Sequence, residues 1–265
     1  MIYTYDWERD FYMVRIIMSG CNGHMGQTIT RIVKETEGAE IVAGIDKYKG
    51  IENDYPVYGD ISECTEEADA VIDFSAPAVL DGLLDYGRKT KTPLILCTTG
   101  YTDEQKKAIE DSSNEVPILR SANMSLGVNV LAKLLTEAVK QLAPAGFDVE
   151  IVEKHHNLKK DAPSGTALYL ADSVNAGADN KYKYVYDRSQ RSEARPHDEI
   201  GISAVRGGTI PGDHDVIFAG EDEVITFSHR AYSKAVFAKG AVQAAVYMKG
   251  KSPGMYSMSD VVGTV

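Results

Sequence analysis

The chain's densest group of cationic and titratable side chains lies in one segment, EKHHNLKKDAPSGTA, at residues 153–167. Its basic members are Lys154, His155, His156, Lys159 and Lys160. Histidine exchanges protons near neutral pH, as a general acid or base must. Lysine can bind a carboxylate or donate a proton, and a helix expected to begin near Ser164 adds free N–H groups that bind anions. The segment therefore predicts a site that binds a carboxylate substrate and transfers a proton.

Two other interpretations apply to such a segment. Most lysine-rich runs are solvated surface, and adjacent histidines can bind a metal ion. A metal site is not predicted, because neighbouring residues on an extended chain point apart and no cysteine or carboxylate completes a credible ligand set. The three cysteines, Cys21, Cys64 and Cys97, are widely spaced and form no CxxC pair. They predict neither disulfides nor a zinc site, and are typical of a reducing cytoplasm.

A glycine loop, GCNGHMG, follows the first expected strand and precedes the first expected helix. Its glycines are Gly20, Gly23 and Gly26. Such a loop is typical of dinucleotide binding, where the backbone approaches a pyrophosphate at a helix N-terminus, although a tight strand-to-helix turn has the same appearance. Asp46 ends the second expected strand, where a carboxylate accepts both ribose hydroxyls of NAD. Lys47 or Lys49 could pair with a 2′-phosphate, so both NADH and NADPH are expected cofactors.

Small polar residues follow the fourth and fifth expected strands, at Cys97–Gly100 and Ser121–Met124. In an open α/β sheet the ligand lies beyond the carboxyl ends of the strands. These segments could therefore approach the nicotinamide-ribose end of a cofactor, although ordinary loops have the same composition.

Short β-branched runs alternate with helix-length segments in the first half of the chain, which predicts a parallel sheet with crossover helices. Ser75 and Pro77 are expected to start the helix after the third strand, and Thr102 with Gln105 forms a capping box. The expected strands are 14–19, 40–45, 70–74, 94–97 and 116–119, and the expected helices start near residues 27, 78, 102 and 128.

The second half has a different pattern, in which strands follow one another with a single helix between them. This pattern predicts an α+β domain with a mostly antiparallel or mixed sheet. The expected strands are 148–154, 200–205, 216–219 and 224–229, with helices at 164–176 and 233–248. The helix over 128–142 is predicted to bury one face, made of Val128, Leu131, Leu134, Leu135, Ala138, Val139 and Leu142.

The composition limits the classes of partner. With 28 Lys+Arg against 39 Asp+Glu the formal net charge is −11, so no nucleic acid or anionic membrane is predicted as a partner. A small anionic substrate still fits, because it responds to the local field of its cleft. No apolar run reaches the length of about 18 residues that spans a bilayer. Residues 1–12 carry acids where a signal peptide is basic, and are expected to lie outside the fold.

The glycine loop and the histidine-lysine segment together resemble the signature of the 4-hydroxy-tetrahydrodipicolinate reductase (dihydrodipicolinate reductase) family, from about Val14 to the end of the chain. The resemblance implies a Rossmann domain at 1–126 and 236–265, and a substrate-binding and oligomerisation domain at 127–235. It implies a cytoplasmic homotetramer that uses NADH or NADPH. His24 stands where the family often has arginine, so no preference between the two cofactors is predicted.

The implied activity is the NAD(P)H-dependent reduction of (2S,4S)-4-hydroxy-2,3,4,5-tetrahydrodipicolinate, a small dicarboxylate, to tetrahydrodipicolinate in lysine biosynthesis through diaminopimelate. By this resemblance His155 is the general acid/base, Lys159 a proton donor, and His156, Gly165 and Thr166 bind the substrate. The implied cofactor-binding residues are Gly20, Cys21, Asn22, Gly23, His24, Met25, Asp46, Lys47, Cys97, Thr98, Thr99, Ser121, Ala122, Asn123 and Met124. The alternatives are another amino-acid-pathway dehydrogenase, such as an aspartate dehydrogenase, or a nucleotide-binding protein without turnover.

Overall fold

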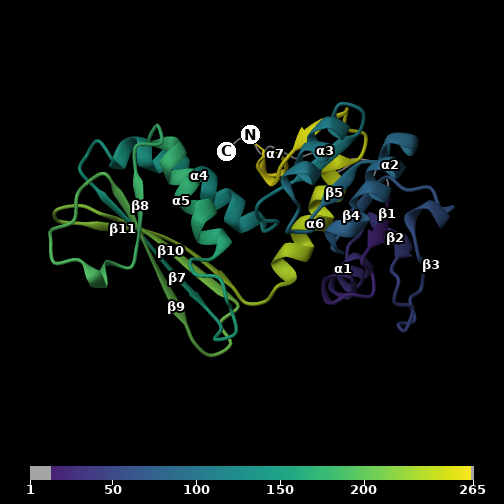
Figure 1. The fold of residues 1–265 in the computed structure, drawn as a ribbon, viewed down its shortest axis with the longest axis horizontal. Helices are drawn as coiled ribbons and strands as arrows, with labels where there is room; N and C mark the ends of the chain where they lie inside the picture. The colour runs from purple at the N-terminus through teal and green to yellow at the C-terminus, as the bar shows by residue number, and fades with distance from the viewer. Residues whose placement is uncertain (1–12, 264–265) are drawn as a thin grey trace, which may run out of the picture. The chain divides into compact units, whose positions relative to one another are not determined.

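The computed structural model describes residues 13–263, and the extension expected at residues 1–12 lies outside them. The chain divides into two compact units. One contains the described residues up to Ser121 together with Ala241–Ser257, and the other contains Ala122–Gly240 and the described residues from Met258 onward. Each unit has a sheet of its own (Figure 1).

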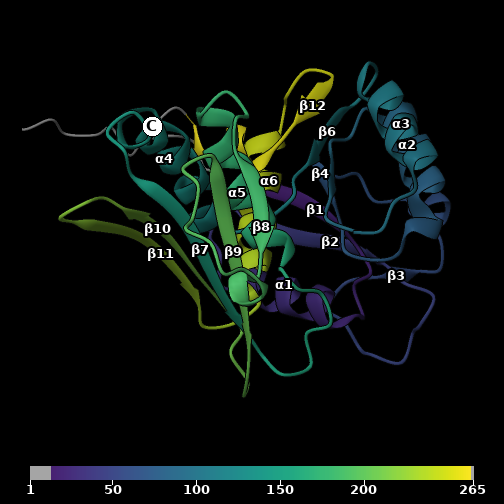
Figure 2. The same cartoon turned by 60° about the vertical axis from the view of Figure 1, so that its left-hand side comes forward.

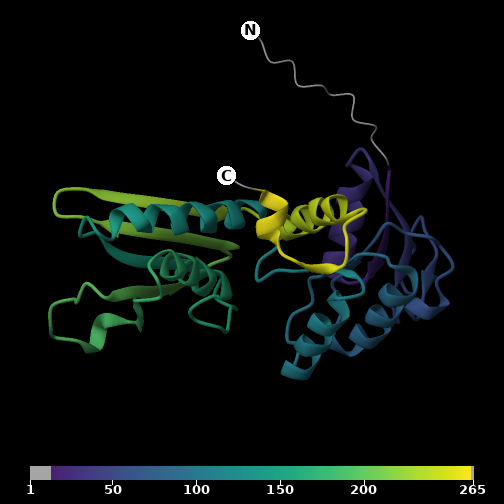
Figure 3. The same ribbon diagram turned by 90° about the horizontal axis from the view of Figure 1, so that it is seen from above.

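The first unit is built on a seven-stranded sheet in the order β12-β6-β5-β4-β1-β2-β3, in which every pair is parallel. Helices α2 and α3 lie on one face of this sheet, and α1 and α6 on the other (Figures 2 and 3). Both faces are therefore covered, as the parallel pattern requires. The strands are β1 (Val14–Ser19), β2 (Ala39–Ile45), β3 (Val57–Tyr58), β4 (Ala70–Asp73), β5 (Leu94–Leu96), β6 (Pro117–Arg120) and β12 (Gly254–Tyr256), and the helices are α1 (His24–Lys34), α2 (Leu80–Thr90), α3 (Asp103–Ser113) and α6 (Ala235–Met248).

The observed starts of the helices show which of the predicted capping residues do cap a helix. The capping box of Thr102 and Gln105 is present at α3. Helix α1 begins at His24 rather than near residue 27, because Gly23 leads directly from the glycine loop into the helix. Ser75 does not cap a helix: Ala76 precedes a short 3-10 turn that has Pro77 in its first position, and the Ser75 hydroxyl donates to Asp73 instead.

The second unit contains a five-stranded mixed sheet in the order β11-β10-β7-β9-β8. The β11-β10 and β10-β7 pairs are antiparallel and the β7-β9 and β9-β8 pairs parallel, so of the two expected arrangements, mostly antiparallel or mixed, the sheet has the mixed one. Helix α5 is the reason, because a crossover helix after β7 returns the chain in the same direction. The elements are α4 (Leu126–Leu142), β7 (Asp148–His155), α5 (Gly165–Gly177), β8 (Lys183–Tyr186), β9 (Glu199–Arg206), β10 (Gly212–Ala219), β11 (Val224–Ala231) and α7 (Met258–Val262).

Helices α4 and α5 contribute to one core with the sheet of the second unit. The predicted face of α4 is buried at Leu131, Leu135 and Val139, but Leu134 is 40% exposed. A residue lies about 100° around the helix from the next one, so Leu134 falls at the edge of the face that Leu135 centres. Helix α7 packs on α4 in this unit, whereas the expected limits, 1–126 with 236–265 and 127–235, placed it in the dinucleotide-binding domain.

Candidate functional site

In the glycine loop of the first unit, other backbone atoms lie so close to Gly20 and Gly26 that a side chain at either position would collide with them. Gly20 has φ +79°, and a β-carbon there would lie 2.5 Å from the Phe74 carbonyl oxygen. A β-carbon on Gly26 would lie 2.2 Å from the Gly20 oxygen, so α1 packs directly on the loop. Gly23 precedes α1 without a side-chain cap. The first N–H groups of α1 are therefore left for an anion such as a pyrophosphate.

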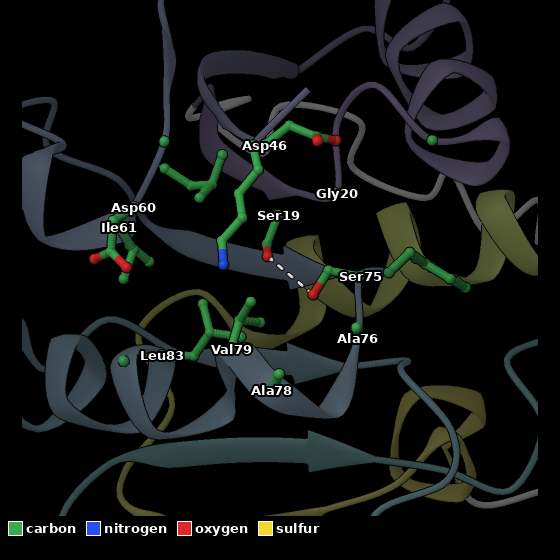
Figure 4. Close-up of a pocket in the computed structure, with 16 residues that line it drawn as sticks. Ser19, Gly20, Asp46, Asp60, Ile61, Ser75, Ala76, Ala78, Val79 and Leu83 are labelled. Carbon is green, nitrogen blue, oxygen red and sulfur yellow. Dashed lines mark hydrogen bonds between the residues drawn. The ribbon is translucent and has the colours of Figure 1, made fainter. Parts of the chain in front are cut away.

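A pocket of about 470 Å³ opens beside this loop (Figure 4). Four predicted cofactor residues line it: Gly20, Gly23, Asp46 and Lys47. The other lining residues, none of which was predicted to bind the cofactor, are Ser19, Ile45, Gly59, Asp60, Ile61, Phe74, Ser75, Ala76, Ala78, Val79, Gly82 and Leu83. The volume is in the range of small-molecule sites. Apolar walls next to a carboxylate and a glycine loop suit the adenosine half of a dinucleotide.

The Asp46 carboxylate is held at the end of β2 by two backbone donors. Asn22 N–H donates to one oxygen at 3.0 Å and Tyr48 N–H to the other at 2.9 Å. The Asn22 side chain in turn donates to the Tyr48 carbonyl oxygen. Each carboxylate oxygen retains a lone pair for a further donor, so this arrangement can accept ribose hydroxyls while it links the loops after β1 and β2.

A second carboxylate, Asp73, lies at the end of β4 and was not among the predicted site residues. Its side chain is fully buried and accepts hydrogen bonds from Ser75, from Thr98 at 2.6 Å and from Tyr101 at 3.4 Å. Burial raises the pKa of Asp73. The carboxylate joins the loops after β4 and β5, and its signal in the sequence was an acid at the end of an apolar strand.

The other predicted cofactor residues of the first unit contribute in different ways. Cys21 is fully buried, and burial together with Asp46 raises the pKa of its thiol to about 11, so only its backbone is available to a ligand. Burial also raises the pKa of the Cys97 thiol. His24 is exposed in the first turn of α1 with Met25 half-buried behind it, and Thr99 is exposed beyond β5.

Ser121 ends the first unit, and the next three predicted residues lie in the second. Ala122 is exposed, whereas Asn123 and Met124 are buried. The Asn123 amide donates to the Thr166 hydroxyl at 2.9 Å, and its carbonyl oxygen accepts from Ser125 N–H at 2.8 Å. The side chain of Asn123 therefore supports a predicted substrate residue.

His155 lies at the carboxyl end of β7 and is 7% exposed. Its Nδ1 is 2.6 Å from a Glu153 oxygen, and its ring meets that of His214 edge-on, with centroids 5.1 Å apart. Burial lowers the pKa of His155, Glu153 opposes this by stabilising the imidazolium, and Lys159 lowers the pKa further. With burial and Glu153 acting on its pKa in opposite directions, His155 can exchange a proton.

The loop after β7 brings Lys159 and His156 into one turn. Lys159 N–H donates to the His156 carbonyl oxygen at 3.2 Å, and its ammonium is 2.9 Å from an Asp161 oxygen. His156 is half-buried, and its N–H donates to Ile210 on the connection before β10. Lys159 is thus a partly buried ammonium with one carboxylate partner rather than a solvated surface lysine.

Helix α5 begins immediately after this loop. Ser164 caps it by accepting a hydrogen bond from Ala167 N–H at 3.1 Å. Gly165 is exposed, and among residues 13–263 no atom outside its own stretch of helix backbone and its chain neighbours lies within 4 Å of where its β-carbon would be. Thr166, the next residue, is half-buried. Because no side chain covers Gly165, the N–H groups at the start of α5 are accessible to a carboxylate.

Three residues around His155 were not predicted: Glu153, Arg206 and His214. Glu153 carried a usable signal, because Val149, Ile151, Glu153 and His155 alternate along β7 and so share its buried side. Arg206 and His214 come from β9 and β10, and nothing in the sequence placed them beside residue 155. Among residues 13–263, no group of three His, Cys, Asp or Glu residues is arranged to hold a metal ion. No helix in that range is long and apolar enough to cross a membrane.

Comparisons with known proteins relate both units to the same family of reductases. Models of the dihydrodipicolinate reductase N-terminus and C-terminus match residues 14–124 and 127–262. The 4-hydroxy-tetrahydrodipicolinate reductase of Caldanaerobacter subterraneus subsp. tengcongensis is 53% identical over 94% of this chain and 98% of its own, and that of Clostridium tetani is 50% identical over 94% and 96%.

Solved structures show the same fold. A dipicolinate-bound dihydrodipicolinate reductase from Paenisporosarcina sp. TG-14 aligns with a TM-score of 0.78 at 23% identity, over 92% of this chain and 97% of its own. The diaminopimelate dehydrogenase of C. glutamicum aligns at 0.56 and 12% identity, over 95% and 96% of the two chains. With family models that match nearly the whole described chain and relatives about half identical to it, the chain belongs to the dihydrodipicolinate reductase family.

Proposed function

We propose that His155 and Lys159 provide the proton for the reaction this chain catalyses, the NAD(P)H-dependent reduction of (2S,4S)-4-hydroxy-2,3,4,5-tetrahydrodipicolinate to tetrahydrodipicolinate. The observation that carries the activity is the 53% identity, over 94% of the chain, to a relative named 4-hydroxy-tetrahydrodipicolinate reductase. The reaction places the chain in lysine biosynthesis through diaminopimelate.

The residues of the first unit fit a nicotinamide dinucleotide. The loop from Gly20 to Met25 would hold the pyrophosphate, Asp46 the adenosine ribose, and Lys47 a 2′-phosphate when NADPH is bound. Cys97–Thr99 and Ser121 of this unit would hold the nicotinamide end, and Ala122–Met124, which belong to the second unit, are proposed for the same role. NADH or NADPH supplies the hydride when bound, and the glycine cradle, Asp46 and the pocket of about 470 Å³ support this assignment.

The reaction consumes one hydride and one proton and releases the ring hydroxyl as water. Hydride addition to a ring carbon builds negative charge on the substrate, which a protonated group must neutralise. His155 and the Lys159 ammonium lie in the same segment of the second unit, and both can carry that proton. His156 and the N–H groups of Gly165 and Thr166 would bind the two carboxylates of the substrate.

The test is a steady-state assay that follows oxidation of NADH or NADPH while the substrate is made in situ from pyruvate, aspartate semialdehyde and the preceding synthase. We expect His155→Ala and Lys159→Ala each to lower kcat by about 100-fold or more, with little change in cofactor affinity. Unchanged kcat in both variants would overturn the assignment of these residues. An inactive wild-type chain would overturn the activity itself.

We further propose that the chain is a cytoplasmic homotetramer. A reductase that consumes NADH or NADPH must be where those cofactors are made. The three cysteines are unpaired in the structure, which is compatible with a reducing compartment. Light scattering after size exclusion should give four times the chain mass of 28.9 kDa, and a monomer or dimer mass would contradict the tetramer.

A further inference from the structure

The carboxylate of Glu153 is fully buried beside His155 in the second unit. Four nitrogen atoms lie within hydrogen-bond distance of it. One oxygen accepts from Arg206 at 2.7 Å and lies 2.6 Å from His155 Nδ1, and the other accepts from Arg206 at 2.7 Å and from Ser164 N–H at 2.9 Å. This carboxylate therefore connects β7, β9 and the start of α5 at one point.

The donors around Glu153 hold it as an anion. Burial alone raises the pKa of a carboxyl group, but hydrogen bonds from Arg206, His155 and Ser164 outweigh burial and lower the pKa of Glu153. Arg206 uses both terminal nitrogens on the two carboxylate oxygens, the arrangement that gives the strongest and most directional ion pairs. The guanidinium also donates to the carbonyl oxygens of Val205 and Asp161, so it is fixed in turn.

An anionic carboxylate only accepts hydrogen bonds, so the His155 nitrogen that contacts it must carry a hydrogen. We propose that Glu153, held in place by Arg206, is a positioning residue that fixes the Nδ1–H tautomer of His155 and leaves Nε2 as the atom that exchanges the proton. This inference deepens the proposed function and rests on the role assigned there to His155. Carboxylate-histidine pairs work in this way when they set which ring nitrogen is protonated.

The surroundings of Nε2 support this assignment. Within residues 13–263, no hydrogen bond is made by Nε2, and Gly212 on β10 faces it. A β-carbon on Gly212 would lie 3.0 Å from Nε2, so the glycine keeps this edge of the ring open for a substrate. The neighbouring charged and titratable groups are Glu153 on β7, Lys159 and Asp161 on the following loop, Arg206 on β9, and His214 on β10 with His229 behind it on β11.

The direct test is Glu153→Gln, which keeps the shape of the side chain and removes its charge. Without the carboxylate, Lys159 and Arg206 disfavour the imidazolium. If His155 donates the proton, the limb of the kcat profile that falls as pH rises should then move to lower pH. We expect kcat at neutral pH to drop by about 10- to 100-fold, with little change in the Kd of NADH or in the KM of the substrate.

A matched control is Asp215→Asn on β10. Asp215 is a partly buried carboxylate that pairs with Lys154 at 2.7 Å, and its strand register places it on the opposite face of the same sheet. Its loss should leave the kcat profile unchanged. A folded Glu153→Gln chain that binds NADH normally and keeps the wild-type kcat profile would overturn the proposal.

A second measurement does not depend on any variant. In the wild-type chain labelled with ¹⁵N-histidine, NMR spectra above the pKa of His155 should show the neutral ring with its hydrogen on Nδ1. A neutral ring with its hydrogen on Nε2 would overturn the proposal, even if the Glu153→Gln chain does not fold. Because this readout needs no turnover, it separates failure of the positioning role from failure of the proposed activity.

Discussion

Asp46 connects cofactor recognition to the fold at the scale of one residue. Its carboxylate accepts hydrogen bonds from the backbone of Asn22 and Tyr48 and lines the pocket beside the glycine loop. An anion at this position favours ribose hydroxyls and repels a 2′-phosphate. We therefore expect the choice between NADH and NADPH to depend on the balance between Asp46 and the neighbouring Lys47.

Asp46→Ala should weaken NADH binding by about tenfold, the magnitude of losing a hydrogen bond to a charged group, and should weaken NADPH binding less. Fluorescence titration with both cofactors measures the two Kd values. Asp54→Ala is the control, since Asp54 is an exposed carboxylate paired with Lys34. Equal loss of affinity for NADH and NADPH in the Asp46 variant would contradict the ribose assignment.

His214 predicts a pH dependence of stability. Burial lowers its pKa from 6.5 to about 4, and its Nε2 is 2.9 Å from the Ser164 hydroxyl. The unfolded chain binds a proton at this site below about pH 6.5 and the folded chain does not until about pH 4. Stability from this residue is therefore complete above about pH 6.5 and is lost as the pH falls toward 4, by about 3 kcal/mol at most.

His214→Gln should remove that part of the pH dependence. Urea unfolding between pH 7 and pH 4 should show a smaller decrease in the free energy of unfolding for the variant than for the wild-type chain. His155 and His229, whose pKa values burial also lowers, remain in both proteins. Parallel curves for the two chains would contradict the assignment.

At the scale of elements, Arg195 ties the connection between β8 and β9 to the sheet. It is 17% exposed and donates to the carboxylates of Asp148 and Glu150 and to the carbonyl oxygens of Val149 and Glu199. This side chain therefore helps to hold a long connection on β7. Its removal takes one cation from a partly buried ion-pair network in which Glu150 keeps Arg188 and Asp148 keeps His197, so the cost lies below that of breaking a fully buried pair.

Arg195→Met should lower the free energy of unfolding by about 2 kcal/mol, between the values for exposed and fully buried pairs, and make the connection at 187–198 more sensitive to proteolysis. Arg230→Met is the matched control, because Arg230 is 63% exposed and 3.8 Å from Asp213. Arg230→Met should lower the free energy of unfolding by less than about 1 kcal/mol. Equal destabilisation by the two substitutions would contradict the clamping role of Arg195.

Element type was predictable where a long periodic pattern existed. The first strand, the capping box at Thr102 and the long helix α4 were all indicated by local residues. Strands β3, β8 and β12 were missed because they are short and none of their residues is buried. Strand β5 is as short but was found, because its three residues are all buried and apolar and so form a continuous apolar run. The mixed order of the second sheet depends on β8 and on the crossover through α5, so it could not be deduced from the strands that were found.

At the scale of the whole molecule, the chain passes between its two units three times, after Ser121, Gly240 and Ser257. The local motifs of the site were predictable, because the glycine loop and the histidine-lysine segment are each continuous in the sequence. Glu153 could have been found from the alternation of β7. Arg206 and His214 could not, because only the sheet register brings β9 and β10 beside His155.

The central claim is that this chain moves a hydride from the nicotinamide cofactor to the ring of a dicarboxylate substrate. Mass spectrometry of the product, formed with NADH deuterated at the transferable position of C4, tests that claim most directly. We expect the wild-type chain to form tetrahydrodipicolinate that carries one deuterium, and His155→Ala to slow its formation greatly. Product without deuterium, or no product from the wild-type chain, would contradict it.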